Sequence, residues 1–242
     1  MKKPLNIAII GGGISGLTLA YYLSKNGHKP VIFEKKENLG GLLGTFNIDG
    51  LGKIKLEKNY HHSFTDDKYT LELINNLGIA KDEMEWRRAL MSVFIKNKFH
   101  SFLIPLDLLK FSHLSVFSKL RLGLFVIFLK IQKNCKKYKN IKASVWIEKY
   151  GGKQVWQMIW RPLFEGKFGK FYKEINLSWF CSRIKQRGHS SNKKGEILGY
   201  PKRSYQHIID KLEEKILLAG GKIYKKSEVK KLNLLKIINL NY

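Results

Sequence analysis

The hydrophobic residues near the amino terminus form two short runs separated by a helical pattern. Residues 7–10 are continuously apolar, as expected for a parallel strand that is covered on both faces. Residues 17–27 follow with a helical pattern and end in a glycine, the residue preferred at a helix carboxyl cap. A second apolar run lies at 30–33. The pattern predicts a strand–helix–strand unit at the start of an α/β domain.

A glycine-rich turn joins the first predicted strand to the helix. Gly11, Gly13 and Gly16 follow the G-x-G-x-x-G spacing. In that motif the first glycine permits a tight turn, the second lets a pyrophosphate approach the backbone, and the third lets the helix pack on the strand. The N–H groups at the helix start attract phosphate. Glu34 ends the second strand, where a carboxylate can accept the hydroxyls of an adenosine ribose. The pattern predicts a dinucleotide site with these candidate contacts: Gly11, Gly12, Gly13, Ile14, Ser15, Gly16, Glu34 and Lys35.

Two further segments are predicted to be helical. In 205–219 apolar residues recur at helical spacing, and a turn and a strand follow at 220–224. Residues 107–131 are rich in leucine and phenylalanine, but their most apolar stretch, 122–129, is far shorter than the roughly 20 residues that cross a bilayer. Lysines follow at Lys130, Lys133, Lys136, Lys137, Lys139 and Lys142.

The segment 107–142 has two interpretations, and both stay open. An apolar helix joined to a basic one would suit peripheral contact with an anionic membrane surface. The same pattern fits a core helix followed by a solvated lysine face.

Composition narrows the class of protein. Of the 242 residues, 44% are hydrophobic, enough to bury a core, which excludes a disordered tail. The net charge is +26, yet only 7 of the 45 basic residues are arginine, the residue that reads nucleic acids. The excess of lysine, isoleucine and asparagine favours coding bias over a functional basic face, and no nucleic-acid partner is expected.

The cysteine content also restricts the possibilities. Cys135 and Cys181 are the two cysteines, and their spacing indicates neither a disulfide framework nor a zinc site. We therefore expect no metal and a reducing compartment. The expected location is the cytoplasm, or the inner membrane surface if 107–142 contacts lipid.

The residues after the second strand resemble a known family. Glu34, a short spacer, and the pair Gly40 and Gly41 resemble the extended FAD-binding signature of the superfamily of FAD-dependent amine oxidases, protoporphyrinogen oxidases and phytoene desaturases. Many members have arginine after the glycine pair, where this chain has Leu42. That departure points away from the monoamine oxidase branch.

Later segments extend the resemblance. Glu57 precedes Tyr60-His61-His62, as in bacterial FAD-dependent oxidoreductases, and 160–169 is similar to their PLL-x-x-KFG stretch. Residues 199–202 resemble the return into the FAD domain, although 203–204 is Arg-Ser where the family usually has Gly-Gly.

The resemblance implies a fold and a division of the chain. The fold would be α/β, a Rossmann-like FAD-binding domain with a mostly helical substrate domain inserted. Residues 1–64 would form the first part of the FAD domain, 65–198 the substrate-binding region, and 199–242 an incomplete return in which Val229 makes main-chain contact with adenine. Because the match covers about the first half of the family's pattern, we expect a truncated chain and a complementing chain that carries the remainder.

The resemblance also implies a function. An FAD-dependent oxidoreductase would transfer hydride from a small or lipid-like metabolite to flavin. No motif identifies the catalytic residue; His61, His62 and Lys167 are candidates, and the residues expected to line the substrate site are Tyr60, His61, His62, Trp160 and Arg183. Two alternatives stay open: a flavin-dependent sugar-nucleotide isomerase resembling UDP-galactopyranose mutase, and a non-catalytic remnant or subunit of a split flavoenzyme.

Overall fold

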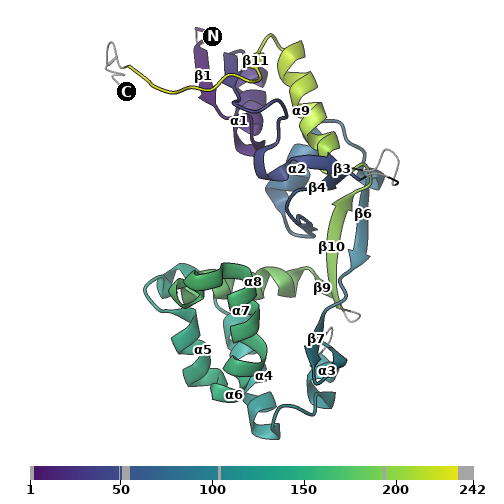
Figure 1. Ribbon diagram of the computed structural model, residues 1–242, viewed down its shortest axis with the longest axis vertical. Helices are drawn as coiled ribbons and strands as arrows, with labels where there is room; N and C mark the ends of the chain where they lie inside the picture. Colours follow the sequence, from purple (N-terminus) through teal and green to yellow (C-terminus); the bar gives the residue numbers. More distant parts are fainter. Residues whose placement is uncertain (1–2, 49, 51–54, 103–104, 193–194, 234–242) are drawn as a thin grey trace. The chain divides into compact units, whose positions relative to one another are not determined.

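The computed structural model describes residues 3–48, 50, 55–102, 105–192 and 195–233, so the last part of the predicted return, 234–242, lies outside the described residues. The chain forms two compact units (Figure 1). The first unit comprises Met1–His62, Tyr69–Glu85 and Tyr200–Tyr242, and the second comprises Ser63–Lys68 and Trp86–Gly199.

The elements follow one another as a mixture of strands and helices. The strands are β1 (Asn6–Ile10), β2 (Lys29–Phe33), β3 (Thr45–Asn47), β4 (Lys55–Glu57), β5 (Ser63–Phe64), β6 (Met84–Arg88), β7 (Ser92–Ile95), β8 (Lys98–Ser101), β9 (Ser191–Asn192), β10 (Gly195–Pro201) and β11 (Lys222–Tyr224). The α-helices are α1 (Ile14–Lys25), α2 (Lys68–Asn76), α3 (Pro105–Lys110), α4 (Val116–Lys130), α5 (Ala143–Gly151), α6 (Lys153–Val155), α7 (Arg161–Phe168), α8 (Leu177–His189) and α9 (Gln206–Leu218).

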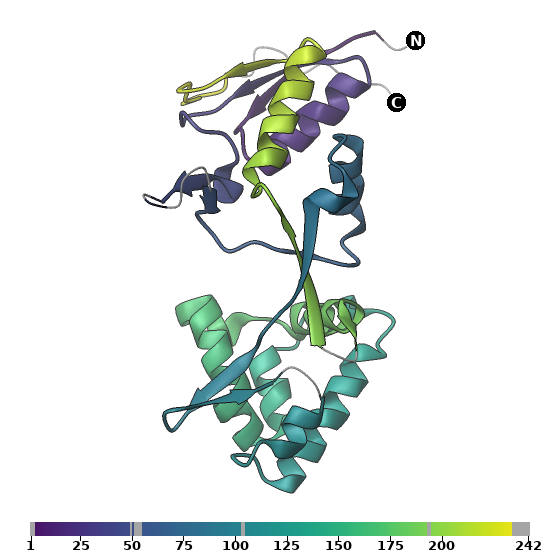
Figure 2. The ribbon, with the colours of Figure 1, turned by 90° about the vertical axis from the view of Figure 1, so that its right-hand side faces the viewer.

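The first unit is built on a parallel sheet of order β1-β2-β11. Helices α1 and α9 lie side by side against it (Figure 2). Ile32 of β2 is fully buried between these layers. The predicted strand–helix–strand unit is therefore confirmed, and α9 and β11 form where a helix and a strand were predicted at 205–224. The fold is α/β, as predicted.

Residues 69–85 belong to the first unit, although they lie within 65–198, the range predicted as the substrate-binding region. The reason is packing. Apolar side chains of α2 and of the segment after it enter the same core as β2, α1 and α9; they are Leu73, Ile74, Leu77, Ile79 and Met84.

The second unit is mostly helical and has an aromatic core. Its buried side chains include Phe111, Phe125, Trp156, Phe164 and Phe180. The predicted helix at 107–131 is divided into α3 and α4. The division occurs because Ser115 caps α4, its hydroxyl accepting a hydrogen bond from the N–H of Ser118 at 3.2 Å. The lysine-rich segment after α4 is not a second helix, since its regular part is the short 3-10 turn Cys135–Tyr138.

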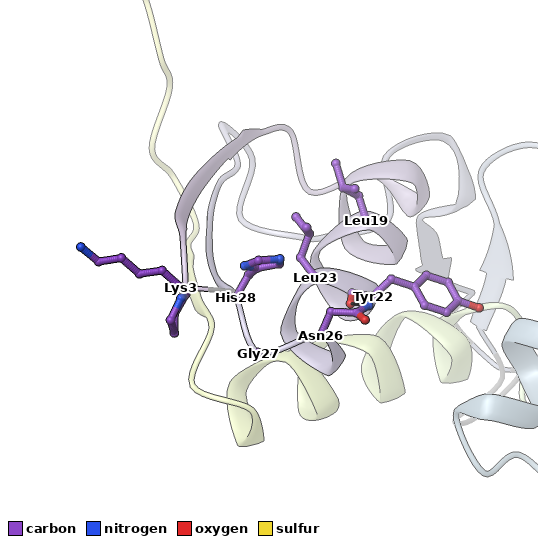
Figure 3. Close-up of a pocket in the computed structure, with 8 residues that line it drawn as sticks. Lys3, Leu19, Tyr22, Leu23, Asn26, Gly27 and His28 are labelled. Carbon is purple, nitrogen blue, oxygen red and sulfur yellow. Dashed lines mark hydrogen bonds between the residues drawn. The ribbon is translucent and has the colours of Figure 1, made fainter. Parts of the chain in front are cut away.

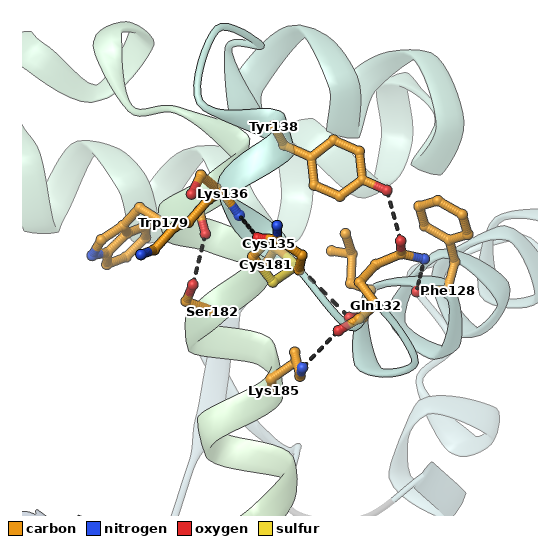
Figure 4. The surroundings of a disulfide bond; sticks show 12 residues. Phe128, Gln132, Cys135, Lys136, Tyr138, Trp179, Cys181, Ser182 and Lys185 are labelled. Atoms are coloured by element: carbon orange, nitrogen blue, oxygen red, sulfur yellow. Dashed lines mark hydrogen bonds between the residues drawn. A yellow bond between two sulfur atoms is a disulfide. The ribbon is translucent and has the colours of Figure 1, made fainter.

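A disulfide joins Cys135 and Cys181, so the expectation drawn from cysteine spacing was wrong (Figure 4). The cysteines are 46 residues apart, but the 3-10 turn packs on α8 and brings their Cα atoms to 5.8 Å. Next to the bond, the amino group of Lys185 donates to the carbonyl of Gln132 at 2.6 Å, and the hydroxyl of Tyr138 donates to the Gln132 side chain at 2.8 Å. The bond and these contacts tie the end of α4 to α8.

Candidate functional site

The glycine turn between β1 and α1 is closely packed. Gly11 has a φ of 100°, which favours glycine, and its N–H donates to the carbonyl of Phe33 at 2.8 Å. A Cβ at Gly16 would lie 2.1 Å from the carbonyl oxygen of Gly11. Only glycine lets α1 approach the strand end this closely.

Glu34 closes the turn from the other side. Its carboxylate accepts hydrogen bonds from the N–H of Gly12 at 2.6 Å and from the N–H of Lys36 at 2.9 Å, one on each oxygen. The side chain is buried, with 8% of its surface exposed. Each carboxylate oxygen has a second lone pair. The acid can therefore hold the turn and still accept a hydroxyl from a ligand.

A second glycine turn lies against the first. The N–H of Gly40 donates to the carbonyl of Gly12 at 2.8 Å, and Gly13 and Gly40 form an isolated parallel bridge. A Cβ at Gly41 would lie 3.1 Å from the Cα of Gly13. The two pairs of glycines thus form a backbone cradle without side chains.

The amino terminus of α1 opens onto this cradle. Gly13 occupies the cap position, and neither a side-chain cap nor an acidic residue is present in the first turn. Ile14 and Ser15 begin the helix, and Ser15 is exposed. Uncapped N–H groups at a helix start, beside glycines that allow close approach, suit a pyrophosphate.

The remaining predicted cofactor residues lie beside Glu34. Lys35 is exposed. The segment after β11 runs along this edge, because the N–H of Ser227 donates to the carbonyl of Glu34 at 2.8 Å and that of Lys226 donates to Lys36 at 3.1 Å. Val229, half-buried, follows two residues later. The donors and acceptors of this site therefore fit the adenosine diphosphate part of a dinucleotide.

Tyr60, His61 and His62 lie together in the first unit. The hydroxyl of Tyr60 is 2.7 Å from that of Tyr200, and its ring centroid is 5.2 Å from that of His62. The Nδ1 atom of His61 is 2.6 Å from the carbonyl oxygen of Asn59. The Tyr60–Tyr200 contact joins the segment to the end of β10, and the other two contacts lie within the segment.

Asn59 and Glu57 were not predicted as site residues, although both lie beside the Tyr-His-His motif. The amide of Asn59 donates to the carbonyl of Leu42 at 3.1 Å, which joins the motif to the second glycine turn. The carboxylate of Glu57 accepts from the N–H of Tyr205 at 3.0 Å. The family resemblance at Glu57 was the sequence feature that could have indicated a role for this carboxylate.

Trp160, Lys167 and Arg183 lie in the second unit. The amino group of Lys167 lies 5.5 Å from the centroid of the Trp179 ring, and the Arg183 guanidinium lies 5.9 Å from the same centroid. Partial desolvation, followed by repulsion from Arg183 and Arg187, lowers the pKa of Lys167. Trp160 packs edge-on against a phenylalanine of α8, with ring centroids 4.8 Å apart. The predicted substrate residues thus form two groups, one in each unit.

A separate hollow of about 810 Å³ lies toward the carboxyl end of α1 (Figure 3). Its lining includes Leu19, Tyr22, Leu23 and His28. The imidazole of His28 already accepts the N–H of Leu5 at 3.3 Å. The hollow is at the opposite end of α1 from the glycine turn, so it is not part of the candidate site.

The described residues include neither a metal cluster nor a membrane-spanning helix. Within the described ranges, no group of three or more His, Cys, Asp or Glu side chains is arranged to hold a metal ion. Among the residues that the structure covers, no helix combines the length and apolarity needed to pass through a bilayer.

Comparison with known proteins gives both family and fold matches. A family model described as flavin containing amine oxidoreductase matches residues 14–236. The 15-cis-phytoene desaturase of Capsicum annuum is 27% identical over 255 residues, covering 96% of this chain and 42% of the relative. That of Glycine max is 37% identical over 97 residues, 40% of this chain and 16% of the relative. The chain therefore spans less than half the length of these curated relatives.

Solved structures agree in fold. An oxidoreductase from Methanosarcina mazei superposes with a TM-score of 0.63 at 19% identity, covering 92% of this chain and 51% of that one. Reduced UDP-galactopyranose mutase gives 0.61 at 15% identity, covering 91% and 48%. At these identities the likeness establishes the fold alone.

Proposed function

We propose, from the premise that this chain belongs to the family of flavin-containing amine oxidoreductases, that its first unit binds FAD and that the protein is an oxidoreductase of a small or lipid-like metabolite. The family assignment confirms the resemblance drawn from the sequence. The observation that carries the proposal is the cradle formed by Gly12, Gly13, Gly40 and Gly41, with Glu34 at its edge.

Each part of the cradle has a defined task in this proposal. The start of α1 holds the pyrophosphate through its N–H groups, at Ile14 and Ser15. Glu34 accepts the ribose hydroxyls with the lone pairs that Gly12 and Lys36 leave available. Val229 lies beside the same edge and meets the adenine.

Bound FAD would supply a hydride acceptor for a substrate carbon. The protein would contribute binding, orientation and proton transfer. Since the carbonyl of Asn59 can only accept, the Nδ1 of His61 must carry the proton of their hydrogen bond. In the neutral imidazole this leaves Nε2 as the basic atom. We assign His61 the task of accepting a substrate proton at Nε2, with Tyr60 and His62 beside it.

The cations of the second unit support a substrate with an anionic group. Lys167 and Arg183 both lie near the Trp179 ring, and the described contacts of Arg183 include a neutral partner, Gln186, at 2.6 Å. Desolvation is the main cause of the lowered pKa of Lys167, and repulsion from Arg183 and Arg187 adds to it. An anionic ligand would relieve that repulsion.

Anaerobic flavin bleaching tests the redox part of the proposal. The protein is loaded with FAD and mixed in turn with primary amines, amino acids and polyenes, while the absorbance of oxidised flavin is followed. We expect one class to bleach the flavin, and His61→Gln to slow bleaching without loss of bound FAD. If FAD binds and no class reduces it, the oxidoreductase proposal fails while the cofactor proposal stands.

A further inference from the structure

Helix α4 of the second unit is apolar on two opposite faces. One face packs into the core through Leu122, Phe125 and Leu129, which are at most 4% exposed. The opposite face, here called the α4 face, is formed by Val116 (82% exposed), Phe117 (67%), Leu120 (58%), Leu124 (59%), Ile127 (58%), Phe128 (41%) and Ile131 (69%). At 3.6 residues per turn these side chains lie within an arc of about 120°. The α4 face is therefore a continuous apolar stripe, not a scatter of exposed residues.

Cations border the α4 face and α4 contains no acidic residue. The amino group of Lys119 donates to the carbonyl of Leu109 at 2.6 Å, and Arg121 donates to the carbonyl of Tyr150 at 2.8 Å. These partners are neutral carbonyls, and the described contacts of both side chains include no carboxylate. At the carboxyl end of the stripe, exposed lysines follow at Lys130, Lys133, Lys136, Lys137 and Lys139.

We propose that the α4 face binds the surface of a membrane that contains anionic lipid. An apolar stripe with cations along its borders is the pattern of a helix that lies in the plane of the interface, with apolar side chains among acyl chains and cations at the phosphates. The 15-residue helix is about 22 Å long, too short to cross a hydrocarbon core of about 30 Å. The helix would therefore lie on the bilayer instead of spanning it.

The positive charge favours anionic lipid over a second copy of this chain as the partner of the α4 face. The protein carries a net charge of +26, and a dimer through two α4 faces would bring the cations that border each face close to one another. Anionic headgroups instead neutralise them, at about a fivefold gain in partitioning for each lysine near the surface. This inference does not depend on FAD binding or on the reaction.

Vesicle cosedimentation tests the proposal with the full chain. The vesicles are phosphatidylcholine alone or phosphatidylcholine mixed with phosphatidylglycerol. We expect binding to the mixed vesicles, little binding to phosphatidylcholine alone, and release by added salt. The double variant Leu120→Ser/Leu124→Ser should weaken binding at least about tenfold, because both side chains would leave the acyl region.

Matched controls distinguish binding by the α4 face from nonspecific hydrophobic adsorption and from the effect of net charge. Leu218→Ser removes a side chain on α9 that is 75% exposed, and should leave binding unchanged. Lys133→Gln/Lys137→Gln should weaken binding more than Lys25→Gln/Lys29→Gln, which removes the same charge from the first unit. Circular dichroism of each variant verifies that it folds.

Three results would overturn the proposal. One is a wild-type protein that stays in the supernatant with phosphatidylglycerol vesicles. Another is an equal loss of binding in the α4 variants and their controls, which would mean that net charge alone drives adsorption. A third is a dimer in sedimentation equilibrium that Leu120→Ser/Leu124→Ser converts to monomer, which would assign the face to a second copy.

Discussion

Gly16→Ala tests the packing on which the proposed cofactor site depends. The new Cβ would lie 2.1 Å from the carbonyl oxygen of Gly11, whereas ordinary contacts begin near 3.4 Å. The carbonyl belongs to the backbone of a turn whose N–H is bonded to Phe33, so it cannot rotate away as a side chain would. Helix α1 must instead move by about 1 Å, and overpacking of this kind costs about 1–3 kcal/mol.

Helix propensity opposes that cost. A 2.1 Å contact with a backbone atom places the overpacking cost in the upper part of that range, at about 2–3 kcal/mol. Alanine in a helix is favoured over glycine by up to about 1 kcal/mol, so the expected net destabilisation of Gly16→Ala is about 1–2 kcal/mol. Gly123→Ala is the matched control, because Gly123 is also inside a helix and a Cβ there has no atom within 4 Å. It should stabilise the protein by about 0.5–1 kcal/mol.

Equilibrium unfolding in urea, followed by circular dichroism, measures both effects. The midpoint should fall for Gly16→Ala and rise for Gly123→Ala, with unchanged slopes. If Gly16→Ala were as stable as the wild type or more stable, the close approach of α1 to the turn would be refuted.

Three further predictions concern other parts of the molecule. The Cys135–Cys181 bond closes a loop of 46 residues, and its reduction restores about 4 kcal/mol of chain entropy to the unfolded state. In calorimetry, dithiothreitol should therefore lower the unfolding temperature by roughly 10 °C. It should have no effect on the double serine variant. Burial raises the pKa of Glu196, and the positive charge of Arg187 offsets part of that rise. The contribution of Glu196 to stability therefore falls as pH rises from the ordinary pKa of 4.5, and Glu196→Gln should flatten that part of a stability–pH profile. Gly40→Ala should lower the urea midpoint more than Gly27→Ala. Both residues have positive φ, but only at Gly40 would a Cβ meet a side chain, an isoleucine of α9, at 2.4 Å. Equal losses in the two variants would contradict the packing of the second glycine turn.

The first unit could be predicted because its signals are local. All of them lie within residues 7–34: an apolar run of strand length, glycines at fixed spacing, and an acid at the end of the next strand. Even there the boundaries shifted: α1 begins at Ile14, three residues before the helical pattern of apolar residues begins, because the turn glycines lead directly into it.

Features that depend on contacts between residues far apart in the sequence could not be predicted in this way. The disulfide joins positions 46 residues apart, and only the packing of a short turn on α8 brings them together. Hydrophobic periodicity indicates that α4 is apolar, but not that Leu124 is exposed while Leu122 is buried. Ser204 adopts a φ of 61° where the resembled family usually has glycine, a conformation that its residue type does not suggest.

Calorimetric titration with FAD tests the central claim most directly. In the proposed function, the glycine cradle, the start of α1 and Glu34 all bind the adenosine diphosphate part of the cofactor. We therefore predict that the chain binds one FAD, that ADP competes for the site, and that Glu34→Gln weakens both ligands about tenfold through loss of a charge-assisted hydrogen bond. A folded protein that takes up neither FAD nor ADP, or that binds both equally well after Glu34→Gln, would contradict the assignment of this site.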